Sequence, residues 1–198
     1  SITQDDGEML AAAETGKIKI SRSQLAGPFM SDFSSWGPTS DLQIKPEITA
    51  HGGEILSAVP GQGYDRQSGT SMAAPNQAGA TALIRQYVKE TIGNGLSAAE
   101  VTAIVNRLMM STTDIVYDKN GLPSSVRKQG SGLVNIAKAT SSAGYITTYD
   151  GDVAMDKTKL ELGDDKDKTG VYEMTFGVTN VSGSAVSYDV DSIIMTEG

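Results

Sequence analysis

Gly69-Thr70-Ser71-Met72-Ala73-Ala74-Pro75 joins a polar loop to a long segment rich in alanine and glycine. Small and apolar residues then recur at three- and four-residue spacing, which predicts a mostly buried helix that begins near Ser71 and reaches Val88. Pro75 fits only the first turns of such a helix, because proline has no backbone N–H. Ser71 is therefore expected at a helix N-terminus.

A serine at that place has two interpretations. The first turn of a helix has unpaired backbone N–H groups and a dipole that stabilises negative charge, so Ser71 would have its hydroxyl and its own N–H where a nucleophile needs them. The plainer interpretation is that Ser71 only caps the helix, because serine and threonine are favoured capping residues. Residues 69–75 by themselves favour the capping role, so the choice between the two interpretations depends on the rest of the sequence.

Composition bounds the class of protein. The 198 residues, 38% of them hydrophobic, can form one or two domains with a real core. A net charge of −8 without a basic patch argues against nucleic-acid binding, and the absence of cysteine excludes disulfides, a thiol nucleophile and thiolate metal sites. No apolar run approaches the roughly 20 residues of a membrane helix, and no signal peptide opens the chain, so a secreted protein would carry its signal upstream.

Five segments together carry a resemblance to a known family. They are Phe33-Ser34-Ser35-Trp36-Gly37-Pro38-Thr39, Ile44-Lys45-Pro46-Glu47-Ile48-Thr49-Ala50, Gly52-Gly53-Glu54-Ile55-Leu56-Ser57, Ser68-Gly69-Thr70-Ser71-Met72-Ala73-Ala74-Pro75 and Gln129-Gly130-Ser131-Gly132-Leu133-Val134. In order and spacing they resemble the serine-bearing end of the subtilase family. The last segment resembles the close of the catalytic domain in lactocepin-type cell-envelope proteinases. The resemblance implies that Ser71 is the nucleophile of a serine endopeptidase rather than a cap.

The resemblance also implies roles around the nucleophile. The Ser71 backbone N–H is expected to donate to the oxyanion, and Met72 to line the leaving-group side of the substrate cleft. Gly69 and Thr70 are expected to shape the entry of the turn and to belong to the cleft. Three residues depart from the commoner family residues at their positions, namely Asn76 for histidine, Glu47 for aspartate and His51 for proline.

His51 is the only histidine, so it is the only imidazole base that this chain can offer. One hypothesis pairs it with Ser71 and with an aspartate such as Asp32 or Asp41. We reject it, because the subtilisin order is Asp, His, Ser and the family histidine lies far upstream of the serine. His51 is expected to be a partly exposed turn residue.

The other catalytic segments of a subtilase are not recognisable in the sequence. We find no Asp-Ser/Thr-Gly segment for the aspartate, no His-Gly-Thr-His segment for the base and no upstream glycine-rich segment with the oxyanion asparagine. The resemblance therefore implies a bacterial, extracellular or cell-surface endopeptidase acting on proteins or peptides, of which this chain alone is inactive. The alternative is a binding or adhesion module on a degenerate subtilase scaffold.

Other partners and cofactors are only weakly indicated. No cofactor or metal site is evident in the chain, since its acidic residues lack the spacing of a calcium loop. Calcium binding and cell-wall association of the complete protein stay open. A partial subtilase would expose apolar surface, so we expect the chain to self-associate.

Three regions follow from the resemblance and the residue patterns. Residues 1–28 are expected to be the tail of an inserted protease-associated domain, with a helical stretch over 6–14 and a strand over 17–20, and a return linker. Residues 29–144 are expected to form the C-terminal part of an α/β subtilisin-like catalytic domain. Residues 145–198 are expected to begin a fibronectin type III-like β-sandwich, because apolar residues alternate near 160–162, 172–178 and 186–190.

Two further helices are predicted within the catalytic part. Ser97 and Glu100 form the pattern of a capping box, and an apolar stripe follows, made of Val101, Ile104, Val105, Leu108 and Met109. A short helix is expected over residues 135–139.

Overall fold

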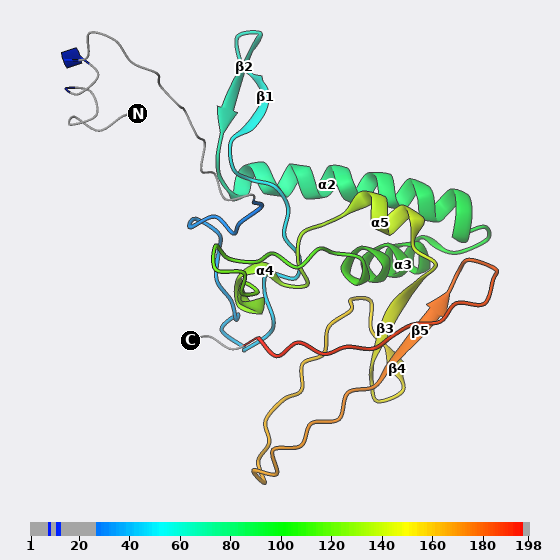
Figure 1. The fold of residues 1–198 in the computed structure, drawn as a ribbon. Coiled ribbons are helices and arrows are strands. Elements are labelled where there is room, and N and C mark those ends of the chain that lie inside the picture. The colour runs from blue at the N-terminus through cyan, green and yellow to red at the C-terminus, as the bar shows by residue number, and fades with distance from the viewer. Residues whose placement is uncertain (1–7, 9–10, 13–26, 196–198) are drawn as a thin grey trace.

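The computed structural model describes residues 8, 11–12 and 27–195. Figure 1 shows the long helix α2 (Thr70–Tyr87) with α3 (Ala98–Ser111) and α5 (Ile136–Ser141) beside it, and a hairpin at the N-terminal end of α2. The remaining elements are β1 (Ile55–Val59), β2 (Gly63–Gln67), α4 (Val126–Gln129), β3 (Gly144–Asp150), β4 (Val153–Ala154) and β5 (Phe176–Asn180). The expected helix over 6–14 is described only at residues 8, 11 and 12, which are helical, and the expected strand over 17–20 lies outside the described residues.

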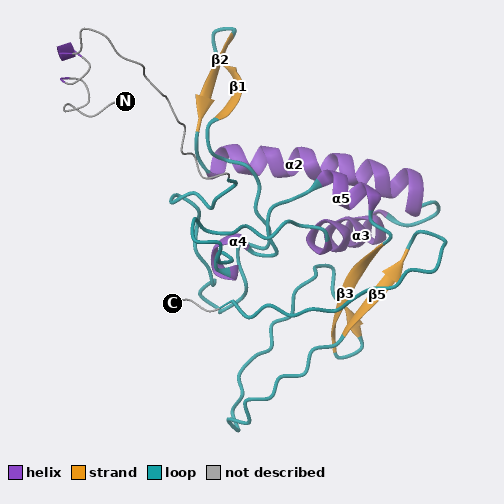
Figure 2. Ribbon diagram, viewed as in Figure 1, coloured by secondary structure: helices purple, strands orange, loops and turns teal. Residues whose placement is uncertain are grey.

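Helix α2 begins and ends close to the predicted residues. It continues into one π-helical turn, η1 (Val88–Ile92), and Gly93 ends it. The expectation that this helix is mostly buried is wrong for this chain, because only Ala80 and Ile84 of α2 are buried and the Leu83 side chain is 53% exposed. The apolar spacing identified a helix, but burial depends on which elements cover it, and α3 and α5 contact α2 along one side (Figure 2).

Helix α3 has the predicted capping box and the predicted apolar face. The Ser97 hydroxyl accepts from the Glu100 N–H at 3.3 Å, and the Glu100 carboxylate accepts from the Ser97 N–H at 2.8 Å. The stripe expected on α3 is buried and lies at the centre of the core, which consists of Ile84, Val88, Val101, Ile104, Val105, Leu108, Met109, Ala139 and Tyr145. The core therefore joins α2, η1, α3, α5 and the start of β3.

The C-terminal part forms an antiparallel sheet in the order β4-β3-β5, with Ile146 opposite Val178. Of the expected strand over 172–178, only the part from Phe176 onward is paired, and the segments 160–162 and 186–190 lie outside the strands. Alternating hydrophobicity predicts which side chains share a face, but a strand also needs a neighbour to complete its hydrogen-bond ladder. The continuation as a fibronectin type III-like sandwich stays a prediction.

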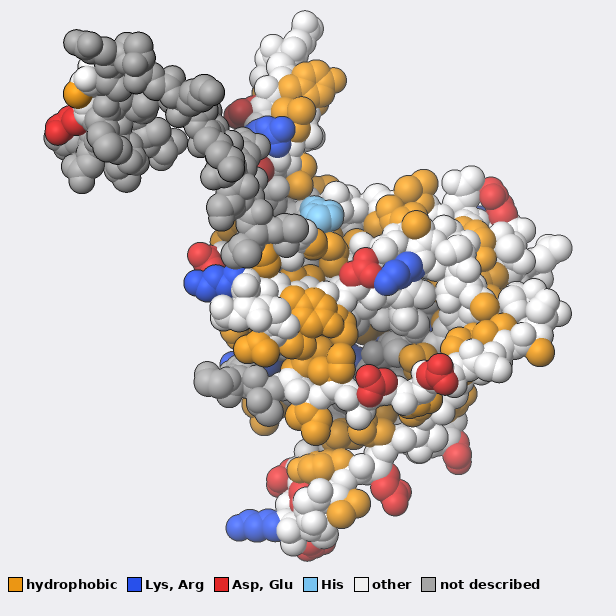
Figure 3. All heavy atoms as spheres, in the orientation of Figure 1, with side chains coloured by type: hydrophobic (Ala, Val, Ile, Leu, Met, Phe, Trp, Pro, Cys, Tyr) orange, Lys and Arg blue, Asp and Glu red, His pale blue; other side chains and the backbone are white. Residues whose placement is uncertain are grey.

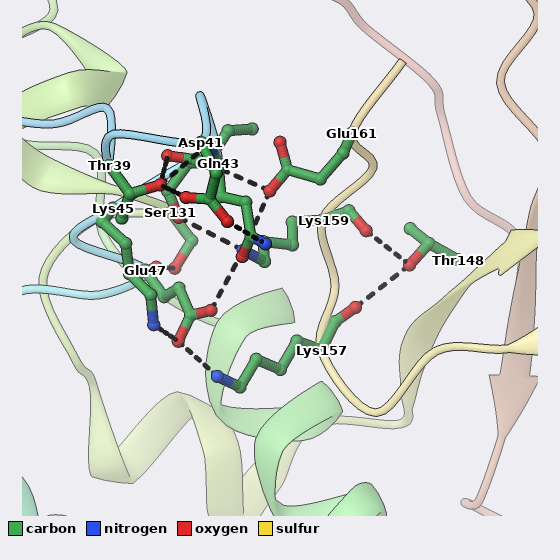
Figure 4. A network of polar contacts seen from close by, with 11 residues as sticks. Thr39, Asp41, Gln43, Lys45, Glu47, Ser131, Thr148, Lys157, Lys159 and Glu161 are labelled. Carbon is green, nitrogen blue, oxygen red and sulfur yellow. Dashed lines mark hydrogen bonds and ion pairs between the residues drawn. The ribbon is translucent and has the colours of Figure 1, made fainter. Parts of the chain in front are cut away.

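A cluster of ion pairs connects residues 157–161 of the C-terminal part to residues 44–47 (Figure 4). The Glu47 carboxylate accepts from Lys157 at 2.6 Å, Lys45 at 3.0 Å and Lys159 at 3.1 Å. Lys159 also pairs with Glu161 at 2.9 Å. Burial alone would raise the pKa of Glu47, but the hydrogen bonds from the three lysines outweigh it and lower that pKa to about 2.

Candidate active site

Ser71 is the second residue of α2 and is exposed to solvent. The preceding Gly69 is the N-cap, and its carbonyl accepts from the N–H groups of Met72 at 3.1 Å and Ala73 at 3.3 Å. Within the described part of the chain, no group accepts from the Ser71 backbone N–H. A hydroxyl, a free N–H and the positive end of the α2 dipole therefore meet at Ser71.

A close backbone contact holds the loop that leads into the helix. The Gly69 N–H donates to the carbonyl of Gly52 at 2.8 Å. Gly52 is buried, and a Cβ atom added to it would lie 2.7 Å from the Gly69 carbonyl oxygen and 3.0 Å from the Ala73 Cβ. Glycine is therefore required at position 52, because any side chain would push the nucleophile loop away.

Side-chain contacts fix the residues that flank this loop. The Ser68 hydroxyl accepts from the Glu54 N–H at 2.8 Å and donates to the Glu54 carboxylate at 3.1 Å. The Arg66 guanidinium donates to the Glu54 carbonyl at 2.9 Å. The base of the β1–β2 hairpin is thereby linked to the residue just before Gly69.

The hairpin and the start of α2 enclose a groove beside the nucleophile. Strands β1 and β2 are antiparallel, with Ile55 opposite Gln67 and Ser57 opposite Asp65. The groove has a volume of about 260 Å³ and is lined by Ile55, Ser57, Ala58, Val59, Asp65, Gln67, Ser71, Met72, Pro75 and Asn76. Exposed apolar side chains, including Leu56 and Tyr64, cover other parts of the hairpin, where orange side chains are visible in Figure 3.

The residues assigned to the cleft from the sequence divide between two places. Met72 lies with Ser71 in the groove, whereas Thr70 lines a second cavity of about 220 Å³ together with His51 and Gly52. Gly69 lines neither cavity and acts through its backbone contacts. The hairpin and Asp65 were not predicted from the sequence, although two short strand-like runs around Pro60-Gly61 are a hairpin signal.

The hypothesis that His51 is the base for Ser71 can be compared with the structure. His51 is exposed, and within residues 27–195 no hydrogen bond or ion pair connects it to Ser71, Asp32 or Asp41. Asp41 is engaged elsewhere, because the Thr39 hydroxyl donates to its carboxylate and lowers its pKa.

The described residues show neither a metal-binding cluster nor a membrane-spanning helix. They contain no cluster of three or more histidine, aspartate or glutamate side chains suited to a metal ion. None of their helices has the length and hydropathy that crossing a bilayer requires.

The chain is similar in sequence to known proteins. The subtilase family model matches residues 16–132. The C5a peptidase of Streptococcus pyogenes is 37% identical over 159 residues, which are 79% of this chain and 13% of that protein. The PI-type proteinase of Lactococcus lactis subsp. cremoris is 35% identical over 178 residues, which are 82% of this chain and 9% of that protein. The solved structure of the Prenylagaramide maturation protease PagA is 28% identical with a TM-score of 0.43, covering 56% of this chain and 36% of that one. The chain thus spans a small fraction of the length of these curated relatives.

Proposed function

Because the chain belongs to the subtilase family, we propose that it carries Ser71 as the nucleophile of a serine endopeptidase. The observation that supports this most is the free Ser71 N–H beside an exposed Ser71 hydroxyl at the N-terminus of α2. A helix cap would use its side-chain oxygen to accept from a following N–H, but the N-cap position is held by Gly69, and none of the hydrogen bonds among the described residues reaches the Ser71 hydroxyl. The serine is therefore not occupied as a cap.

The chemistry follows the serine-peptidase pattern. The Ser71 Oγ forms a bond to the scissile carbonyl carbon and gives its proton to a base, while the carbonyl oxygen becomes an oxyanion that the Ser71 N–H and the α2 dipole stabilise. The C–N bond then breaks, the leaving amine takes the proton from the base, and water hydrolyses the acyl-enzyme. This route needs no cofactor.

The base and its orienting aspartate come, in this proposal, from parts of the protein outside residues 1–198. The chain alone is accordingly inactive. Met72 faces the leaving group in the groove, and Gly69 and Thr70 shape the turn that presents Ser71. The substrates are proteins or peptides, and the complete protein acts outside the cell or at its surface; the names of the two relatives, a peptidase and a proteinase, support the substrate class.

Hydrolysis of fluorescently labelled casein by the complete protein tests the proposal. Ser71→Ala should reduce hydrolysis to background, whereas Ser40→Ala, which removes an exposed hydroxyl with no hydrogen bond within the described residues, should leave it unchanged. Residues 1–198 alone should give background hydrolysis. A complete protein with no hydrolysis of any protein substrate would instead favour the binding or adhesion module.

A further inference from the structure

Among the described residues that line the groove beside Ser71, one is charged, Asp65. The pairing of Ser57 with Asp65 places the Asp65 side chain on the same face of the hairpin as Ile55 and Val59, because side chains across an antiparallel pair share a face. The neighbouring Arg66 points to the opposite face, where its guanidinium donates to the Glu54 carbonyl. The groove lining that the structure describes includes no lysine, arginine or histidine.

The Asp65 charge is not compensated within the part of the chain that the structure describes. Its carboxylate accepts one hydrogen bond, from the backbone N–H of Arg66 at 2.8 Å, and it forms no ion pair. A ligand in the groove would therefore meet a negative charge with open acceptor positions on the oxygens. The ligand that fits it best carries a positive charge.

We propose that Asp65 selects substrates with a lysine or arginine among the first three residues after the scissile bond. This inference rests on the proposed function, because it takes Ser71 as the nucleophile and the Met72 side of the groove as the leaving-group side. Asp65 is a specificity-determining residue that contacts the substrate in the groove and takes no part in the chemistry at Ser71.

The dimensions of an extended peptide fit this assignment. Three residues of extended chain span about 10 Å, so a short leaving segment that starts at Ser71 can follow the groove toward the hairpin. The aliphatic stem of a lysine can lie against the apolar lining, which includes Ile55, Val59 and Pro75, while its ammonium reaches the Asp65 carboxylate. An exposed ion pair of this kind changes binding by up to about fivefold, and exchanging lysine for glutamate changes it by about 20-fold.

The test uses the complete protein and fluorogenic peptides that differ only by lysine, alanine or glutamate at each of the three positions after the scissile bond. For the wild type we expect a kcat/KM ratio, lysine over glutamate, of about 20 at one of these positions, falling as ionic strength rises. Asp65→Asn should bring the ratio close to one, and Asp65→Lys should invert it. The matched control Asp152→Asn removes an exposed charge in the turn between β3 and β4 and should keep the wild-type ratio.

The outcomes separate the two proposals. If Ser71→Ala abolishes cleavage and Asp65→Asn leaves the lysine-to-glutamate ratio unchanged, the role of Asp65 is wrong while the proposed function stands. If cleavage survives in Ser71→Ala, or no peptide or protein is cleaved at all, the proposed function itself fails. If Asp65→Lys lowers cleavage of the lysine, alanine and glutamate peptides equally at every position, the residue affects stability rather than selectivity, and the inference is overturned.

Discussion

Replacing Gly52 by alanine should disable the nucleophile loop, whereas the same change at the neighbouring Gly53 should not. The new Cβ at position 52 would lie 2.7 Å from the Gly69 carbonyl oxygen and 3.0 Å from the Ala73 Cβ. At Gly53 the nearest atom to a new Cβ is the Ser31 Oγ at 3.7 Å, an ordinary contact. The two substitutions add the same atom to adjacent residues, so they form a matched pair.

The magnitude follows from the distances. To reach an ordinary contact of about 3.4 Å, the Gly69 carbonyl must retreat by about 0.7 Å, and the backbone around Ser71 has to move with it. Overpacking of this kind costs about 1 to 3 kcal/mol in the free energy of unfolding. A displacement of this size at a reacting atom lowers the rate by about 10- to 100-fold, since attack depends on alignment.

Two measurements on the complete protein check this expectation. The first is the rate of labelling by a fluorophosphonate, and the second is the free energy of unfolding in urea. Gly52→Ala should lower both, and Gly53→Ala should keep the labelling rate within about twofold of the wild type. Wild-type labelling and stability in Gly52→Ala would refute the close packing of Gly52 against the nucleophile loop.

Three further changes have defined outcomes. Glu47→Gln should lower the free energy of unfolding by about 2 kcal/mol at pH 7. The pKa of Glu47 is lowered to about 2 from its ordinary 4.5, so its contribution to the free energy of unfolding is complete above about pH 5 and is lost as the pH falls toward 2. Urea titrations of the variant should therefore show a flatter dependence of stability on pH over that range. Gln129→Leu should cost about 2 to 3 kcal/mol in the same assay, because the buried Gln129 amide bonds the N–H and carbonyl of Val116, and an unchanged midpoint would contradict this. His51→Ala should keep kcat/KM within about threefold, since His51 is exposed and unbonded to Ser71, whereas a loss of several hundred-fold would make it the base.

Local patterns predicted the helices well. The capping box at Ser97 and Glu100 and the stripe after it predicted α3 and its buried face, because both signals lie within a few residues of one another. The bounds of α2 were also predictable from residues that are close together in the sequence. The burial of α2 was not predictable in this way, because the exposure of Leu83 depends on which distant segments cover that side of the helix.

The candidate site, too, was predictable from the sequence only in part. Ser71 was identifiable because its motif is contiguous in the sequence. The groove was not, because Asp65 joins Ser71 in its lining only through the register of β1 and β2, and the contact between Gly52 and Gly69 joins residues 17 positions apart. Strand pairing and close backbone approach are set by tertiary structure, which hydrophobic periodicity does not encode.

The intact mass of the complete protein after exposure to a fluorophosphonate, with Ser71→Ala as the control, tests whether Ser71 is the nucleophile. We expect a single adduct, located at Ser71, that is lost in Ser71→Ala and absent when residues 1–198 are treated alone. An unlabelled complete protein, or an adduct that persists in Ser71→Ala, would contradict the assignment of Ser71 as the nucleophile.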